Sequence, residues 1–316
     1  MHNLSIIIPH YNSINTLIRL LNSIPDRDDI QVIVVDDKSD QNPYEILSDE
    51  YARRVLFLDN QTEKKGAGTC RNIGLSNATG KWVLFADADD YFLDGFYDII
   101  REFFNTDYDI IFFCPTSIDE LTGKLSTRHR RTERYINYYL NHHDQTAELL
   151  LRFKLVTPWS KLINFEFINN HNIRFDEVTA ANDVMFSTKV GHLMHNFFVS
   201  KQVIYCITRS AGSLTVSPSE ATFDTRLQVF IDRYHYLQHY LSKANFKLLD
   251  LNGWYMIHYA FLYRLDVKKI AETYRTLRKN KISMWNPGNF KLLFRTKRII
   301  RFLEAHKETQ RFITKK

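Results

Sequence analysis

The sequence predicts an α/β fold in which a mixed, mainly parallel sheet is flanked by helices and followed by a C-terminal helical extension. Short, uncharged apolar runs alternate with stretches whose apolar residues recur every three or four positions, which is typical of strand–helix–strand units. Polar clusters directly follow several of the runs. Beyond about Thr222 the pattern becomes helical and aromatic. We therefore predict two regions, residues 1–217 and residues 218–316.

The composition is that of a globular protein. The 316 residues suffice for one large domain or two modest ones, and contents of 44% hydrophobic and 25% charged residues are ordinary. Cys70, Cys114 and Cys206 stand apart and form neither a metal-ligand spacing nor a disulfide framework, which favours a reducing, cytoplasmic location. We expect no signal peptide and no apolar run long enough to span a bilayer. The net charge of +6 is modest, and no nucleic-acid partner is expected.

Strand–helix units fill the N-terminal part of the chain. Strands are expected at 4–8, 30–35, 55–58 and 81–86, and helices at 14–24, 44–53, 66–78 and 94–104. Pro9 is expected to end the first strand. In parallel α/β sheets, ligands bind beyond the carboxyl ends of the strands. Because the segments 9–11, 36–37 and 87–89 each follow a strand, we expect them to share one rim of the sheet and to form a ligand site.

The following stretch predicts a second set of elements. Strands are expected at 109–114, 197–199 and 203–207, helices at 145–153 and 182–193, and a turn at 156–162 that leads into a short strand. Asn182 and Asp183 suit the start of the last of these helices. The same alternation of strands and helices therefore continues to the predicted boundary after Ser217.

Three carboxylates stand within four residues at the end of the apolar run 81–86. Asp87, Asp89 and Asp90 would raise one another's pKa unless a cation or solvent relieves their repulsion. A hard divalent ion prefers oxygen ligands and is the usual partner of such a cluster. The alternative is a polar loop that caps the helix expected at 94–104. The other polar clusters at the same rim favour the metal site.

The C-terminal region combines aromatic and basic residues. A final helix is expected at about 290–306, with an apolar stripe on one side and basic residues on the others. The stripe consists of Leu292, Leu293, Ile299, Ile300 and Leu303, and the basic residues are Lys291, Arg295, Arg298 and Arg301. This composition is typical of an interfacial helix on an anionic membrane, and also of a helix docked on the protein's own core. Both interpretations stay open, as does a homo-oligomer formed through the aromatic helices.

Eight motifs resemble those of bacterial family 2 glycosyltransferases of GT-A fold, especially those that build capsules and other surface polysaccharides. They are SIIIPHYN at 5–12, VVDDKS at 34–39, Gly68 with CRNIG at 70–74, FADADD at 85–90, WSKL at 159–162, IRF at 173–175, NDVMF at 182–186 and RSAGS at 209–213. Each motif alone is weak, but eight in the family's order make the resemblance specific. It covers roughly the first two-thirds of the chain and implies a Rossmann-like GT-A domain over residues 1–217.

The resemblance implies roles for residues at the rim. The nucleotide-binding residues that it implies are Pro9, Tyr11, Asp37, Arg71 and Asp87. Tyr11 would stack on the base, Asp37 would accept a hydrogen bond from it, and Asp87 would lie near the ribose. Asp89 would bind Mn²⁺ or Mg²⁺ on the diphosphate, and Asp90 would share that task. Contacts to phosphate or acceptor oxygens are implied for Lys161, Arg209 and Ser213.

The resemblance also implies a catalytic base. In the family this is the aspartate of a Glu-Asp pair that precedes a helix, and here the position reads Asn182-Asp183. Asp183 is therefore the expected base. Asn182 departs from the pattern, because it removes the repulsion between two carboxylates that would raise the pKa of the base. The alternative role for Asp183 is that of a helix cap.

Together these residues predict an inverting, metal-dependent glycosyltransferase that acts in bacterial surface polysaccharide synthesis. It would move a hexosyl or N-acetylhexosaminyl group from a UDP-sugar to a glycan hydroxyl, with a lipid-linked acceptor at the cytoplasmic membrane face. One alternative is a catalytically impaired module of the same fold that binds nucleotide sugar or glycan. A nucleotidyltransferase is disfavoured, because segment 9–12 replaces a glycine-rich basic loop. We interpret the basic segment 124–134 as a solvated loop in preference to an acceptor-binding patch.

Overall fold

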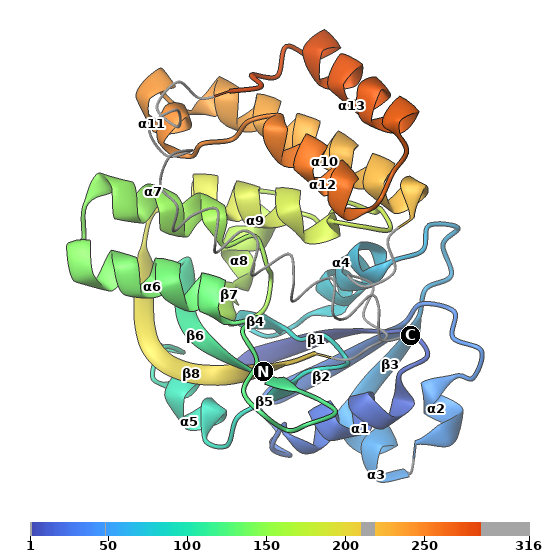
Figure 1. Cartoon of the computed structure of the whole chain (residues 1–316). Helices are drawn as coiled ribbons and strands as arrows, with labels where there is room; N and C mark the ends of the chain where they lie inside the picture. The colour runs from blue at the N-terminus through green and yellow to red at the C-terminus, as the bar shows by residue number, and fades with distance from the viewer. Residues whose placement is uncertain (1, 48, 210–218, 286–316) are drawn as a thin grey trace. The chain divides into compact units, whose positions relative to one another are not determined.

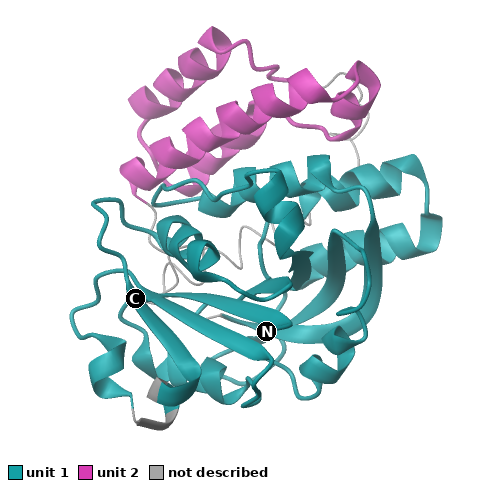
Figure 2. Cartoon of the chain, turned by 180° about the vertical axis from the view of Figure 1, so that it is seen from behind, with its two compact units in different colours: residues 1–209 teal, residues 210–316 magenta. Residues whose placement is uncertain are grey.

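The computed structural model of this chain describes residues 2–47, 49–209 and 219–285 (Figure 1). The chain divides into two compact units, Met1–Arg209 and Ser210–Lys316, which are coloured separately in Figure 2. The predicted boundary after Ser217 falls in the segment 210–218, which lies outside the described residues.

The described part of the first unit contains one eight-stranded sheet, in the order β3-β2-β1-β4-β7-β6-β8-β5. The strands are β1 (Leu4–His10), β2 (Ile30–Asp36), β3 (Val55–Asp59), β4 (Trp82–Phe85), β5 (Tyr91–Phe92), β6 (Ile110–Asp119), β7 (Lys161–Asn164) and β8 (Phe197–Arg209). The β1–β2, β2–β3, β1–β4 and β6–β8 pairs are parallel. Strand β7 runs antiparallel to β4 and β6, and β5 runs antiparallel to β8. This topology confirms the predicted mixed, mainly parallel sheet.

Helices cover both faces of the sheet (Figure 1). They are α1 (Ile14–Asn22), α2 (Pro43–Ile46), α3 (Asp49–Arg54), α4 (Ala67–Asn77), α5 (Phe96–Arg101), α6 (Arg130–His142), α7 (Gln145–Lys154), α8 (Phe165–Asn170) and α9 (Asn182–Leu193). Neighbouring residues of β1 belong to different cores: Ile6 and Ile8 pack with α1 and α5, whereas Ile7 packs with α4, α8 and α9. A strand buried on both faces needs apolar side chains at every position, which explains its continuous apolar run.

Three predicted boundaries are wrong for physical reasons. Strand β1 continues through Pro9 to His10. Its pairing with β4 ends at Ile7, so no hydrogen bond to β4 needs the N–H that Pro9 lacks. Strand β8 is one strand and not two. Its pairing with β6 shifts register near Gln202, and the strand continues past this irregularity. Residues 130–134 are the first turns of α6 and not a loop, because α6 buries a narrow stripe that includes Ile136.

Further elements differ in extent from the prediction, among them α5, which spans Phe96–Arg101 where a helix is expected at 94–104. The helix expected at 44–53 is divided into α2 and α3. Strand β6 extends to Asp119, five residues beyond its expected end, because it pairs with β8 along that length. Helix α9, by contrast, begins and ends at the predicted residues.

The described part of the second unit is helical, as the aromatic pattern predicts. It consists of α10 (Glu220–Tyr240), α11 (Lys243–Leu248), α12 (Trp254–Leu262) and α13 (Val267–Lys279), which share a core around Phe223, Ile231, Met256, Ile257 and Leu277. Side chains of Ser219, Ser242 and Asp266 cap three of these helices. Across the described ranges, no helix combines the length and the apolar character that crossing a membrane requires. The helix expected at 290–306 lies outside those ranges.

Gly68 brings α4 close to the segment that leads into α9. A β-carbon built on Gly68 would lie 2.2 Å from the backbone oxygen of Asp176 and 2.8 Å from the β-carbon of Asn182. Only glycine fits this contact without a shift of backbone. Gly68 therefore helps to set the spacing between the two helices that carry Arg71 and Asp183.

We predict that Gly68→Ala lowers the melting temperature by several degrees, which corresponds to a loss of about 1–3 kcal/mol from overpacking. Thermal unfolding followed by circular dichroism measures this effect. Ser76→Ala is the matched control, because Ser76 lies on the exposed side of the same helix. A Gly68→Ala protein that melts with the wild type would contradict the close contact.

Candidate active site

The loops after β1 and β2 are joined by a buried histidine–carboxylate pair. His10 Nδ1 lies 2.8 Å from Asp36 Oδ1, and both residues are buried. The other ring nitrogen, Nε2, accepts a hydrogen bond from the Ser13 amide at 3.2 Å. Asp36 also accepts hydrogen bonds from the amide and the hydroxyl of Ser39. The two loops are therefore fixed against each other at the carboxyl ends of their strands.

Tyr11 lies on this joined rim with its ring open to solvent. The residue is 54% exposed, and the Lys65 ammonium lies 5.9 Å from the centre of the ring. Pro9, two residues earlier, is half-buried within β1. An exposed aromatic ring at the carboxyl ends of the strands can stack on a flat ligand.

Asp37 connects the same rim to the loop before α4. Its carboxylate accepts hydrogen bonds from Asn60 Nδ2 and from the Gly66 amide, each at 2.7 Å. Its own amide donates to the carbonyl of His10 at 2.8 Å. The residue is buried, the Cys70 thiol is a third donor to it, and a carboxylate can accept about four hydrogen bonds. Asp37 therefore keeps acceptor capacity for a ligand.

Arg71 joins two parts of the predicted site that are far apart in sequence. Its Nη2 donates to Asp87 Oδ1 at 2.6 Å, and its Nη1 donates to Asn182 Oδ1 at 2.8 Å. The guanidinium also lies 5.3 Å from the centre of the Phe175 ring. Arg71 is buried on α4, so the loop after β4 and the start of α9 are held on either side of one rigid fork.

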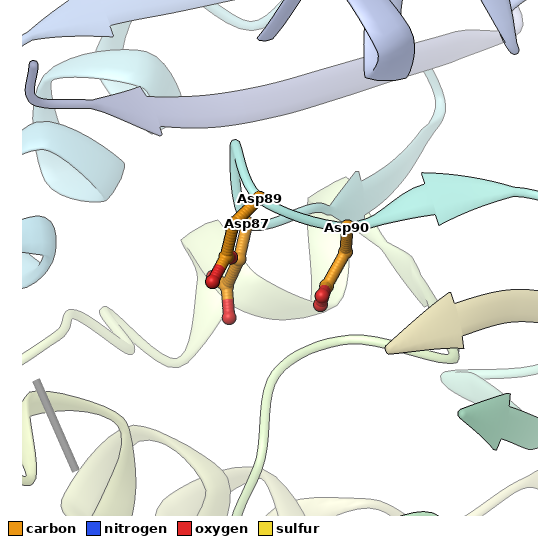
Figure 3. A group of neighbouring side chains, drawn as sticks. All are labelled: Asp87, Asp89 and Asp90. Atoms are coloured by element: carbon orange, nitrogen blue, oxygen red, sulfur yellow. The ribbon is translucent and has the colours of Figure 1, made fainter. Parts of the chain in front are cut away.

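The three carboxylates after β4 form a cluster (Figure 3). Oxygens of Asp87, Asp89 and Asp90 all lie within 4.8 Å of one another. Burial and the charge of Asp87 raise the pKa of Asp89 to about 6. Burial and the charge of Asp89 raise the pKa of Asp90. A divalent cation would relieve this repulsion, and the all-oxygen donor set suits Mn²⁺ or Mg²⁺.

The carboxylate loop is held by strand β8. Asp90 Oδ1 accepts from the Thr208 amide at 2.7 Å, and the Tyr205 hydroxyl accepts from the Asp87 amide at 2.8 Å. The Asp89 carbonyl accepts from the Thr208 hydroxyl and from Arg19 Nη2, the latter at 2.5 Å. Arg19, Tyr205 and Thr208 are not among the site residues predicted from the sequence. The sequence marks Arg19 only as a charged residue beside the apolar stripe of α1.

Arg128, in the basic segment 124–134, contacts β8 beside the carboxylate loop. Arg128 Nη1 donates to the Thr208 carbonyl at 2.8 Å. Its positive charge opposes the burial and the Asp87 repulsion that raise the pKa of Asp89. The solvated-loop interpretation fits Lys124, which is exposed. It does not fit Arg128, which contacts β8 beside the site.

Asp183 lies in the first turn of α9, beyond the cap. The N-cap residue is Ala181, with φ of 58°, and no side chain caps the helix. The helix-cap alternative for Asp183 is therefore wrong. Burial raises the pKa of Asp183, and the positive charges of Arg71 and Lys161 oppose that rise. A carboxylate with a raised pKa accepts a proton more readily than an exposed aspartate does.

The structure places the remaining predicted residues differently. Lys161 is buried in β7, where its Nζ donates to the Leu155 carbonyl at 2.6 Å. Burial lowers the pKa of Lys161 to about 7, against the opposing charge of Asp183. Arg209 is the last residue of β8, and Ser213 lies outside the described residues. Contacts of these three residues with phosphate or acceptor oxygens stay a prediction.

Relatives of known sequence are bacterial glycosyltransferases. The chain is 37% identical over 97 residues to poly(ribitol-phosphate) beta-N-acetylglucosaminyltransferase TarS of Staphylococcus aureus strain Mu50, a match that covers 29% of this chain and 17% of TarS. It is 25% identical over 221 residues to glycosyltransferase GlyA of Streptococcus pneumoniae serotype 4, which covers 67% of this chain and 31% of GlyA. The chain therefore spans less than a third of either relative.

Solved structures share the fold. Residues 1–349 of S. aureus TarS in complex with UDP-GlcNAc superpose with a TM-score of 0.68 at 19% identity, over 89% of this chain and 80% of that one. A mannosyltransferase from Pyrobaculum calidifontis in complex with GDP-Man and Mn²⁺ superposes with a TM-score of 0.53 at 14% identity, over 97% of this chain and 85% of that one. These likenesses confirm the predicted GT-A fold.

The family model of glycosyl transferase family 2 matches residues 5–171, which are more than half of the chain. This stretch holds β1, the carboxylate cluster and the buried Arg71, the parts of the site on which the predicted resemblance depends. The sequence match and the fold agree with that prediction, and the chain belongs to glycosyl transferase family 2.

Proposed function

We propose that this chain is an inverting, metal-dependent glycosyltransferase that uses a UDP-linked donor and a glycan acceptor in bacterial surface polysaccharide synthesis. The observation that carries the proposal is the Arg71 fork, which holds the carboxylate loop and the start of α9 side by side. This geometry supports a site in which the carboxylate loop would bind the donor and Asp183 would be the base. TarS, whose solved structure holds UDP-GlcNAc, supports a nucleotide-sugar donor.

The nucleotide would bind where β1 and β2 end. Tyr11 offers an open ring face on which the base stacks, and Pro9 shapes the start of that loop. Asp37 has acceptor capacity left for an N–H of the base. Arg71 and Asp87, linked at 2.6 Å, would lie beside the ribose and the first phosphate.

Asp89 would hold the metal ion, and Asp90 would share that task. The Thr208 amide donates to Asp90, so the carboxylate of Asp90 is held within reach of those of Asp87 and Asp89. Burial and the charge of Asp87 raise the pKa of Asp89, which supports the binding of a cation beside it. When bound there, Mn²⁺ or Mg²⁺ would supply the charge that neutralises the departing nucleoside diphosphate.

Asp183 would act as the general base in one in-line displacement. Its carboxylate oxygen takes the proton of the acceptor hydroxyl while that oxygen bonds to the anomeric carbon. The bond from the anomeric carbon to the phosphate oxygen breaks, and the electron pair leaves with the nucleoside diphosphate. Attack opposite the leaving group inverts the configuration, so an α-linked donor gives a β-linked product.

The acceptor in this proposal is lipid-linked and meets the enzyme at the cytoplasmic face of an anionic membrane. The second unit has more than twice as many Lys and Arg residues as Asp and Glu residues. This excess of positive charge favours contact with anionic lipid headgroups. Lys161, Arg209 and Ser213 would contact phosphate or acceptor oxygens, and the aromatic helices would allow a homo-oligomer.

A second candidate function is a catalytically impaired module that binds nucleotide sugar without transferring it. Asn182 favours it, because an amide stands beside the proposed base where the family has a carboxylate. In the structure Asn182 instead accepts a hydrogen bond from Arg71 and so contributes to the geometry of the site. This role supports an active enzyme over the impaired module.

We predict that a screen of nucleotide sugars by thermal shift with Mn²⁺ identifies a UDP-sugar that stabilises the protein. The same donor should then be hydrolysed or transferred. Asp89→Ala should reduce this metal-dependent turnover by about 10²-fold or more, because it removes a ligand that neutralises the leaving group. Turnover is measured as released UDP, with and without chelator.

Asp94→Ala is the control for this substitution, because Asp94 is an exposed carboxylate five residues further on. It should keep wild-type turnover. Full activity of Asp89→Ala in the presence of chelator would contradict the metal assignment. Stabilisation by UDP-sugar without turnover over long incubation would favour the impaired module.

We predict that Asp183→Asn abolishes transfer but keeps donor binding, because the substitution removes the proton acceptor and leaves the nucleotide contacts in place. Calorimetric titration with UDP and Mn²⁺ should give an affinity within a few-fold of the wild type. Asp94→Asn is the matched control for the loss of one carboxylate. Wild-type transfer by Asp183→Asn would show that another group is the base.

A further inference from the structure

A short hairpin with a defined backbone follows strand β6 beside the candidate site. The Asp119 amide donates to the Lys124 carbonyl at 2.8 Å, and the Gly123 amide donates to the Asp119 carbonyl at the same distance. Across the turn, Ile118 forms a β-bridge with Leu125. Gly123 has φ of 65°, and a β-carbon built on it would meet open space. The turn is therefore held by its own backbone hydrogen bonds and projects into solvent.

Two leucine side chains of this hairpin are almost fully open to solvent. Leu121 is 81% exposed and Leu125 is 77% exposed. The other exposed large apolar residues of the described ranges, apart from Val267, are 36–59% exposed. A single exposed leucine is ordinary. Two of them on one ordered turn leave apolar surface in water that a partner can cover.

The residues that follow the turn present positive charge. The exposed cations are Lys124, Arg128, Arg130, Arg131 and Arg134. The acidic side chains of the hairpin are already engaged, since Asp119 accepts from the Thr122 amide and hydroxyl, and Glu120 pairs with Arg19. The charge that this segment presents to a partner is therefore mainly positive.

The start of helix α6 adds to this positive charge. Arg130 and Arg131 are its first two residues. The N-terminus of a helix carries the positive end of the helix dipole, so cations are unfavourable there and anions are favourable. Two guanidinium groups at this end repel the dipole, and a bound anion would relieve both. An anionic partner is therefore favoured on independent grounds.

We propose that the hairpin 118–125 and the start of α6 form a surface by which this chain contacts an anionic bilayer. Leu121 and Leu125 would enter the interface, while the arginines would meet lipid phosphates. An acidic peptide or a soluble phosphate would meet the cations but leave both leucines in water. A lipid surface therefore accounts for the apolar and the basic side chains together.

Two contacts fix this surface to the carboxylate loop. Glu120 pairs with Arg19 at 3.1 Å, and Arg19 also donates to the Asp89 carbonyl. Arg128 donates to the Thr208 carbonyl of β8 at 2.8 Å. A bilayer in contact with the hairpin would therefore lie close to the carboxylate cluster. The consequence for catalysis rests on the proposed function, because a lipid-linked acceptor presents its hydroxyl near the headgroups.

The first test reports the surroundings of position 121. Cys70, Cys114 and Cys206 are buried, so a thiol-reactive nitrobenzoxadiazole dye should label Leu121→Cys at the introduced cysteine. With vesicles of equal parts phosphatidylglycerol and phosphatidylcholine, its emission should rise several-fold and shift to shorter wavelength. Leu56→Cys, at an exposed leucine of β3, is the matched control and should keep its aqueous emission. An aqueous signal at position 121, or an equal rise at both positions, would overturn the inference.

The second test measures the affinity of the full chain for the same vesicles by co-sedimentation. Leu121→Ser/Leu125→Ser should weaken binding about tenfold or more, because it removes the apolar side chains that enter the interface. Arg130→Gln/Arg131→Gln should weaken binding about tenfold and reduce its dependence on salt.

Arg53→Gln/Arg101→Gln is the charge-matched control, because it removes two exposed arginines elsewhere in the same unit. It should bind as the wild type does. Wild-type affinity in both test variants, or no binding of the wild type to anionic vesicles, would overturn the inference. Neither test uses sugar transfer. Insertion without transfer would overturn the proposed function and leave the surface, whereas transfer without insertion would overturn the surface alone.

Discussion

One buried guanidinium determines how the parts of this site lie relative to one another. Arg71 bonds to residues 16 and 111 positions away in the sequence, and both partners belong to segments that follow strands or precede a helix. A planar fork with fixed donor directions leaves little freedom to either partner. The close contact at Gly68 sets the distance between α4 and α9 on which the fork depends. Helix α4 in turn packs against β1 and β2, in the core that contains Ile7, Ile33 and Cys70.

The charges of the site fall into two groups that oppose each other. Asp87, Asp89, Asp90 and Asp183 are drawn together by the fold, and burial with mutual repulsion raises the pKa of three of them. Against them stand Arg71, Arg128 and Lys161, each held by a hydrogen bond to the backbone or to a side chain. Such an arrangement suits a divalent cation, which would offset the carboxylates, and a diphosphate, which the cation and the basic side chains would offset in turn. This distribution of charge supports the proposed transfer from a nucleotide sugar.

The sequence predicts those parts of the fold and site that have a local signal. Apolar runs buried on both faces identify β1, β2 and β4, and helical spacing identifies α9 from its first residue to its last. Asp89 and Asp183 follow from motif order. By contrast, Tyr205 and Thr208 meet the carboxylate loop across about 118 residues, and no local pattern marks such a contact. The interior position of Lys161 likewise depends on how β7 enters the sheet between β4 and β6.

The central claim is that the two-sided Arg71 fork aligns the proposed base with the donor-binding loop. The most direct measurement is the transfer rate of Arg71→Lys at saturating donor, because lysine keeps the charge and loses the fork. The account predicts a fall in kcat of about 10²-fold for the folded variant, since a small misplacement of reacting groups is costly. Wild-type kcat in the folded Arg71→Lys protein would contradict it.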